Sequence, residues 1–225
     1  MSKLNTNSNT YIIIYSTVLV VIVAFVLAFV FKALKPMQDA NVELDVKKQI
    51  LYSLNIRNLD GAEAEARYNE VVKDEKEDNG QIFYQCEVDG EPILVVSMKG
   101  MGLWGGISGY IALHGQPTTV YGVYFNHESE TAGLGAEIKD SKAWQEKFIG
   151  KRVFADEKGH DVALSIVKKV EDSSCQVDVV TGATLTSDGV DAMLKKDLLD
   201  ACKRADKLFG KQSVTLPSDS VEVKE

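Results

Sequence analysis

The stretch that organises the last part of the chain reads Asp178-Val179-Val180-Thr181-Gly182-Ala183-Thr184-Leu185-Thr186-Ser187. The apolar run 177–180 predicts a strand in front of the turn, and a helix is predicted from Ser187 to about Leu208. The first turn of a helix presents free backbone N–H groups and a partial positive charge, which favour a phosphate. Hydroxyl side chains stand here beside small residues that leave the backbone open. An ordinary helix cap at Thr184 is the competing interpretation of the same pattern.

Upstream of this stretch the pattern is rich in strands. Two apolar runs, 82–88 and 92–98, are separated by Asp89-Gly90, which is a strong hairpin signal. Two more strands are predicted at 109–113 and 119–126, joined by a Gly-Gln-Pro turn. The sheet is therefore expected to be largely antiparallel.

Helices and loops are expected around these strands. Helical spacing of apolar residues predicts one helix ending near Leu54, a second after Asp60-Gly61 and a third over 139–148. We expect a solvated turn at 73–80, a glycine-rich loop at 99–106 and a strand at 162–170. The fold class is thus α+β.

The apolar run from Tyr11 to Phe31 contains no charged residue and ends at Lys32. At about 1.5 Å per residue it would extend roughly 31 Å, which matches the hydrocarbon core of a bilayer. A cleaved signal peptide usually has a shorter apolar region followed by a small-residue cleavage site. The run therefore predicts an uncleaved, single-pass transmembrane helix in contact with lipid.

Composition excludes several classes of function. The net charge of −8 and the pI near 5.0 argue against nucleic acid, which requires a basic surface. The three cysteines and three histidines are scattered without metal-ligand spacing, so no metal site is expected. The chain also lacks the pattern of a catalytic base, nucleophile or nicotinamide site, and we predict no catalytic residue. Any redox chemistry therefore requires a cofactor.

The sequence Asp178-x-x-Thr181-Gly182-Ala183-Thr184 resembles the attachment motif of FMN-binding domains, in which the last threonine carries FMN through a phosphoester bond. The resemblance places covalent FMN on Thr184, attached by a separate flavin transferase that uses FAD as donor. By the same resemblance, the cofactor-binding set includes the neighbouring residues Asp178, Thr181, Gly182, Ala183, Leu185 and Thr186.

Two further segments resemble the same domains. Residues 130–135, Glu-Thr-Ala-Gly-Leu-Gly, are similar to an E-T-P-G-L-G loop that lies against the isoalloxazine ring, with Ala132 in place of proline. Residues 102–105, Gly-Leu-Trp-Gly, resemble a segment of the C subunit of the Na+-translocating NADH:quinone reductase. The resemblance predicts that Glu130 and Thr131 form hydrogen bonds near the ring. It also places Gly133 and Leu103 at the ring, and Leu134 and Trp104 as apolar contacts to it.

The resemblance implies a subunit that relays electrons between an iron–sulfur centre and a flavin of partner subunits. The whole complex would couple NADH oxidation and quinone reduction to Na+ export. The predicted elements and the resemblance together divide the chain into five parts. These are an N-terminal segment 1–10, a transmembrane helix 11–31, a helical connector 32–80, an FMN-binding domain 81–209 and a polar tail 210–225.

The alternatives are the G subunit of an Rnf-type ferredoxin:NAD oxidoreductase and a flavin-free, membrane-anchored binding domain. A flavin-dependent regulatory domain lacks support because no output domain accompanies it. The resemblance places the soluble domain on the periplasmic side of the inner membrane. The positive-inside rule, applied to Lys3 on one side and Lys32, Lys35, Lys47 and Lys48 on the other, favours the opposite orientation.

Overall fold

The computed structural model describes residues 8–115, 118–156 and 159–210. Residues 1–7 of the predicted N-terminal segment lie outside this range, as does the predicted polar tail beyond Gly210. The chain divides into two compact units, residues 1–45 and 46–225.

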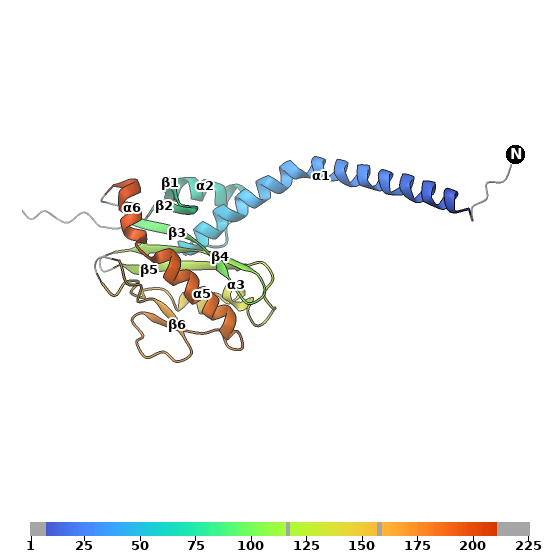
Figure 1. Ribbon diagram of the computed structural model, residues 1–225. Helices are drawn as coiled ribbons and strands as arrows, with labels where there is room; N and C mark the ends of the chain where they lie inside the picture. The colour runs from blue at the N-terminus through green and yellow to red at the C-terminus, as the bar shows by residue number, and fades with distance from the viewer. Residues whose placement is uncertain (1–7, 116–117, 157–158, 211–225) are drawn as a thin grey trace, which may run out of the picture. The chain divides into compact units, whose positions relative to one another are not determined.

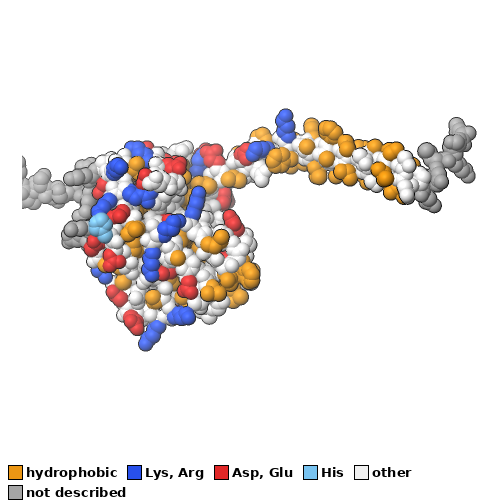
Figure 2. Space-filling view, viewed as in Figure 1, with side chains coloured by type: hydrophobic (Ala, Val, Ile, Leu, Met, Phe, Trp, Pro, Cys, Tyr) orange, Lys and Arg blue, Asp and Glu red, His pale blue; other side chains and the backbone are white. Residues whose placement is uncertain are grey.

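The first unit is the exposed part of helix α1 (Asn9–Ser53), labelled in Figure 1. Apolar side chains project around this helix throughout the predicted span 11–31 (Figure 2). In the described part of the chain, α1 is the one helix long and apolar enough to cross a membrane. The predicted continuation of the helix beyond Pro36 is confirmed, since Pro36 lies inside α1.

The second unit is built on one antiparallel sheet (Figure 1). Its strands follow in chain order: β1 (Val72–Asp78), β2 (Gln81–Val88), β3 (Glu91–Met101), β4 (Gly106–His114) and β5 (Thr119–His127). The predicted hairpin at Asp89-Gly90 is confirmed, because β2 pairs with β3 from Phe83–Val96 to Val88–Glu91. Both turn residues have positive φ, 52° and 81°, as a tight two-residue hairpin turn requires.

Apolar residues line both faces of this sheet, as expected for a central layer covered on two sides. One face packs the alternating residues Leu94, Val96 and Met98 of β3 into the main core, which helix α5 (Thr184–Leu198) shares. The other face buries Tyr84 and Val95 beside the C-terminal end of α1 and helix α2 (Gly61–Val71). The aromatic contact between Tyr52 and Tyr124, with centroids 5.3 Å apart, belongs to this second layer.

The remaining elements carry the segment 178–187, which we call the attachment stretch after the motif that it resembles. They are α3 (Glu137–Asp140), α4 (Lys142–Glu146), β6 (Ser165–Val167), β7 (Gln176–Asp178), α5 and α6 (Ala201–Phe209). Strands β6 and β7 form a separate parallel pair. The expectation of an α+β domain with a largely antiparallel sheet behind an N-terminal helix is confirmed.

Several local predictions were wrong. Residues 72–78, expected as helical connector and turn, form β1, because pairing with β2 satisfies their backbone; only Asn79-Gly80 make the turn. The predicted strand 162–170 shrinks to β6, and the glycine-rich loop to 102–105.

The helices differ from prediction in a similar way. The helix at 139–148 is two short helices that meet at Ser141. The last helix begins at Thr184, three residues earlier than expected, and breaks at Asp200 before α6.

Candidate functional site

The attachment stretch is a short connection between strand β7 and helix α5. Strand β7 ends at Asp178, and α5 begins at Thr184 with Ala183 in the N-cap position. The backbone N–H of Ala183 donates to the Val180 carbonyl at 3.0 Å. The Val180 N–H in turn donates to the Ser187 hydroxyl at 3.0 Å, and the Ser187 side chain is buried. Strand end and first helical turn are therefore tied together.

This geometry excludes a capping role for Thr184. The N-cap residue is Ala183, which has no side chain that could cap the helix, and Thr184 is the first helical residue. Its side chain is half-buried, whereas Thr181 and Leu185 on either side are exposed. A hydroxyl in the first turn of a 15-residue helix stands beside the free N–H groups that attract a phosphate.

The backbone of the turn requires glycine at position 182. Its φ of +78° lies in the left-handed region, which residues with a Cβ rarely adopt. A Cβ at this position would also lie 2.9 Å from Cδ2 of Leu134, the end of an exposed side chain that can move aside. The attachment turn and the 130–135 loop are therefore in direct contact at Gly182.

Glu130 joins the three motifs that the sequence singled out. One carboxylate oxygen, Oε1, accepts from the backbone N–H of Trp104 at 2.8 Å, and the other, Oε2, accepts from the Thr186 hydroxyl at 2.7 Å. The side chain is buried, with 7% of the residue exposed. A Cβ at Gly102 would collide with this carboxylate, so the Gly-Leu-Trp-Gly loop can approach only because of its glycine.

The hydrogen bonds also hold Glu130 in its ionised form. Burial alone would raise the pKa of the carboxyl group. The backbone N–H of Trp104, the Thr186 hydroxyl and the backbone of Leu103 and Gly105 outweigh burial and lower the pKa below its ordinary value. With these donors on its oxygens, Glu130 is placed to organise the site.

Four apolar side chains from these motifs remain open to solvent. The exposed fractions are 46% for Leu103, 67% for Trp104, 43% for Leu134 and 61% for Leu185. The loop that carries Leu103 and Trp104 is closed by a bond from the Gly102 N–H to the Gly105 carbonyl at 2.9 Å. Exposed apolar groups on a fixed loop are suited to contact a flat apolar ligand.

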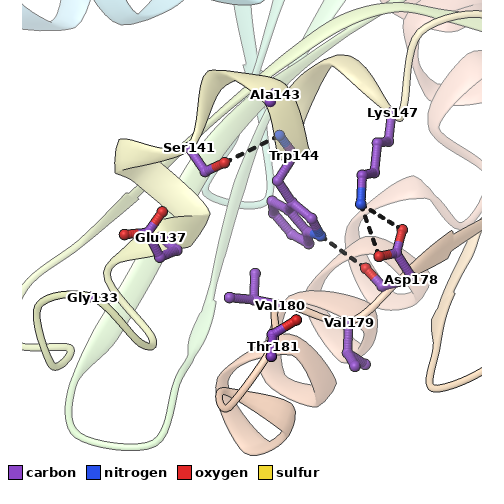
Figure 3. Close-up of a pocket in the computed structure, with 10 residues that line it drawn as sticks. All are labelled: Gly133, Glu137, Ser141, Ala143, Trp144, Lys147, Asp178, Val179, Val180 and Thr181. Carbon is purple, nitrogen blue, oxygen red and sulfur yellow. Dashed lines mark hydrogen bonds and ion pairs between the residues drawn. The ribbon is translucent and has the colours of Figure 1, made fainter.

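A cavity of about 450 Å³ lies beside the attachment turn (Figure 3). Its walls come from α3 and α4 on one side and from the segment 178–181 on the other. Lys147 Nζ lies 2.8 Å from each carboxylate oxygen of Asp178, and the Trp144 indole N–H donates to the Asp178 carbonyl at 2.8 Å. The Asp178 carboxylate is thus held by a residue that the sequence did not suggest.

Thr131 and Gly133 form the turn of the 130–135 loop. The Thr131 carbonyl accepts from the backbone N–H groups of Leu134 and Ala136 at 3.1 and 3.0 Å, and the Thr131 side chain is exposed. Gly133 lines the cavity together with Thr181. The structure therefore places residues of two motifs around one hollow, and Glu130 ties the third motif to them.

These features fit FMN in three respects. The half-buried Thr184 stands at a helix N-terminus, apolar side chains of the three motifs are open to solvent, and a hollow lies beside segment 178–181. Sequence reasoning missed Lys147, Trp144 and Ser187, which fix the stretch, because no spacing in the sequence links Lys147 or Trp144 to Asp178, 31 and 34 residues away.

Comparison with known proteins identifies a domain family and a group of relatives. Residues 102–198 match the FMN-binding domain family. The chain is 40% identical over 128 residues to the C subunit of Na(+)-translocating NADH-quinone reductase from Pseudomonas aeruginosa, covering 52% of this chain and 48% of that protein. It is 39% identical over 133 residues to the protein of the same name from Haemophilus ducreyi, covering 58% of this chain and 46% of that protein. The matches thus span about half the length of these relatives.

The fold has a solved counterpart. The crystal structure of the C subunit of Na(+)-translocating NADH-quinone reductase from Parabacteroides distasonis superposes with a TM-score of 0.65 at 33% sequence identity. The match covers 73% of this chain and 93% of that one.

Proposed function

This chain belongs to the C-subunit family of Na(+)-translocating NADH-quinone reductases, and we propose that it carries FMN covalently, through a phosphoester bond to Thr184. The observation that carries the proposal is the position of Thr184 at the start of α5, in the stretch that Glu130 joins to the other two motifs.

The attachment reaction needs little from this chain beyond a positioned hydroxyl. The Thr184 hydroxyl would form a new O–P bond to the flavin-side phosphorus of FAD as the P–O–P link breaks and AMP leaves. The hydroxyl proton would pass to a base of the flavin transferase. The free N–H groups of the first helical turn stabilise the phosphate charge, by about 0.3–1 kcal/mol at an exposed helix end. Because that is too weak to retain a dissociable cofactor, the covalent bond supplies the retention.

The residues around Thr184 would bind and shield the ring. Leu103, Trp104, Leu134 and Leu185 offer exposed apolar surface, and Thr131 and Thr181 offer exposed hydroxyls. Bound FMN supplies one-electron and two-electron redox chemistry. Glu130 binds the 102–105 loop through the Trp104 N–H and the first turn of α5 through the Thr186 hydroxyl. These hydrogen bonds also keep its carboxylate ionised.

At the level of the complex, we propose an electron-relay subunit of an NADH:quinone reductase that exports Na+. The chain would accept electrons from an iron–sulfur centre and pass them to a flavin, both in partner subunits, and would not oxidise NADH alone. Helix α1 would anchor it as a single-pass protein of the inner membrane. Its maturation requires a flavin transferase.

We further propose that the soluble domain faces the periplasm, against the count of lysines around α1. Protease treatment of spheroplasts tests this orientation: digestion of the domain with the membrane intact is expected, and protection until lysis would place the domain in the cytoplasm.

The attachment is tested by intact mass and in-gel flavin fluorescence of the full chain co-expressed with a flavin transferase. We expect the wild type to gain the mass of FMN less one water and to fluoresce, and Thr184→Ala to do neither. Ser173→Ala, which removes an exposed hydroxyl before β7, is the matched control and should stay fully modified. An unmodified wild type, beside a control substrate that the same transferase labels, would contradict the proposal.

A further inference from the structure

The upstream end of the attachment stretch is held by two bonds from one short helix. Lys147, at the C-cap of α4, places Nζ 2.8 Å from both oxygens of the Asp178 carboxylate. Trp144, one turn earlier, donates its indole N–H to the Asp178 carbonyl at 2.8 Å. Figure 3 shows both side chains reaching from α4 to Asp178 across the wall of the cavity.

Helix α4 is a fixed support for these bonds. Its N-cap Ser141 accepts from the Trp144 N–H at 3.3 Å, and the Trp144 ring packs on Phe125 and Phe148 with centroids 5.7 and 5.1 Å apart. The buried Gln145 donates to the carbonyls of Ile138 and Lys139, both at 3.0 Å. A residue that is bound to α4 is therefore bound to the core.

The path from Asp178 to Thr184 is short and restrained. The Val179 N–H donates to the Val167 carbonyl at 3.0 Å, and the Val180 N–H donates to Ser187. Between Val180 and the helix lie only the three turn residues 181–183. Because the backbone between them is short and restrained, the position of Asp178 affects the position of the Thr184 hydroxyl.

We propose that Asp178 serves flavin attachment as a positioning residue, and that its carboxylate acts through Lys147 of the same chain rather than through contact with FMN or the transferase. The inference rests on the covalent attachment proposed above. It accounts for an acidic residue six positions before Thr184 by a partner within the domain, which occupies both of its oxygens.

The rival account is that the transferase or the cofactor binds the Asp178 carboxylate directly. The Lys147 side chain is 45% exposed and the Asp178 side chain is 48% exposed. An outside group therefore has access to this ion pair. A double-mutant cycle separates the two accounts, because a residue that acts only through a partner has no effect once that partner is gone.

The experiment measures the rate of flavin attachment to the full-length chain by purified transferase with FAD, from fluorescence and intact mass. The variants are Lys147→Met, Asp178→Asn and the pair combined. We expect each single variant to slow attachment by about threefold, within the range that a half-exposed ion pair supports. The combined variant should be no slower than either single variant.

Two controls separate positioning from general destabilisation. Lys142→Met breaks the exposed Lys142–Glu146 pair on the same helix, whose N–O distance is 3.2 Å, and should leave the rate unchanged. Lys147→Arg, which keeps a cation in reach of Asp178, should restore the rate. The Tm of Lys147→Met should match that of Lys142→Met, so a lower rate in the former reports the turn and not the fold.

Each outcome is decisive. Equal rates in the single and combined variants support the inference. A further drop in the combined variant by the full factor of Asp178→Asn would overturn it and assign the carboxylate to the transferase or the cofactor. A wild-type rate in either single variant would also overturn it. A wild-type chain that is never modified would refute the proposed function itself, and with it this inference.

Discussion

The two ends of the attachment stretch are held in different ways. At the downstream anchor, Thr186 and Ser187 are buried and bond to Glu130 and to the Val180 N–H. At the upstream anchor, Asp178 is half-exposed and bonds to Lys147 and Trp144. Buried hydrogen bonds to a charged group are costly to break, whereas exposed ion pairs contribute about 0–1 kcal/mol. The downstream anchor therefore sets the stability of the site, and the upstream anchor adjusts the position of the turn.

Removal of the Glu130 carboxylate should have the largest effect on stability. Glu130→Ala leaves the part-buried Trp104 N–H and the buried Thr186 hydroxyl without their acceptor. We expect the free energy of unfolding to fall by about 2–4 kcal/mol, measured by urea denaturation. Glu128→Ala is the matched control on the same loop, because that side chain is exposed. An equal loss in the two variants would remove Glu130 from the downstream anchor.

Ser187→Ala tests the same anchor at its other bond. The Val180 N–H is then buried without an acceptor, which costs about 1–3 kcal/mol. Hydrogen exchange should show faster exchange of the Val180 amide in the variant than in the wild type. Unchanged protection of that amide would mean that Ser187 does not hold the turn.

Gly182→Ala tests the turn between the anchors. The left-handed φ costs about 1–2 kcal/mol for a residue with a Cβ, and the contact with Leu134 adds to it. Gly80→Ala is the matched control, since its φ is +79° and a Cβ there would meet nothing within 4 Å. We expect Gly182→Ala to lower the Tm more than Gly80→Ala does. In a background that carries Leu134→Ala, the difference between these two Tm losses should be smaller. Equal losses would show that the end of the Leu134 side chain moves aside at no measurable cost.

The smallest expected effect is on stability at acidic pH. The pKa of Glu130 is lower in the folded chain than its ordinary value of 4.5, so the ionised group stabilises the fold above that value. This stabilisation is lost as the pH falls below 4.5 and through the folded-state pKa. Glu130→Gln, which has no charge to lose, should show a shallower decline of Tm over that range. Parallel declines in the two proteins would contradict the role of the ionised carboxylate.

The sequence predicts the elements that local patterns determine. The hairpin at Asp89-Gly90 and the helix after the attachment stretch follow from local patterns, and both are present. The sequence predicts that this helix begins at Ser187. In the structure the Ser187 hydroxyl bonds back to Val180, so the helix begins at Thr184.

Contacts between distant residues were beyond the reach of local patterns. Strand β1 is charged along its length and forms through pairing with β2, with Arg204 of α6 bound to Asp78 at its end. The pairing of Lys147 with Asp178 likewise depends on how α4 packs beside β7. The resemblance predicts hydrogen bonding by Glu130 near the ring, and no local pattern indicated that its oxygens accept from the Trp104 N–H and the Thr186 hydroxyl.

Thr184, and no neighbouring hydroxyl, is the residue that we propose to carry FMN. Tandem mass spectrometry of the tryptic peptide 170–195 tests it directly, because this peptide contains Thr181, Thr184, Thr186 and Ser187. We predict that fragment ions place the whole added mass on Thr184, since Thr186 and Ser187 are buried and Thr181 precedes the helix. Fragment ions that place the mass on Thr181 or Thr186, or a peptide without added mass from transferase-treated protein, would contradict the account.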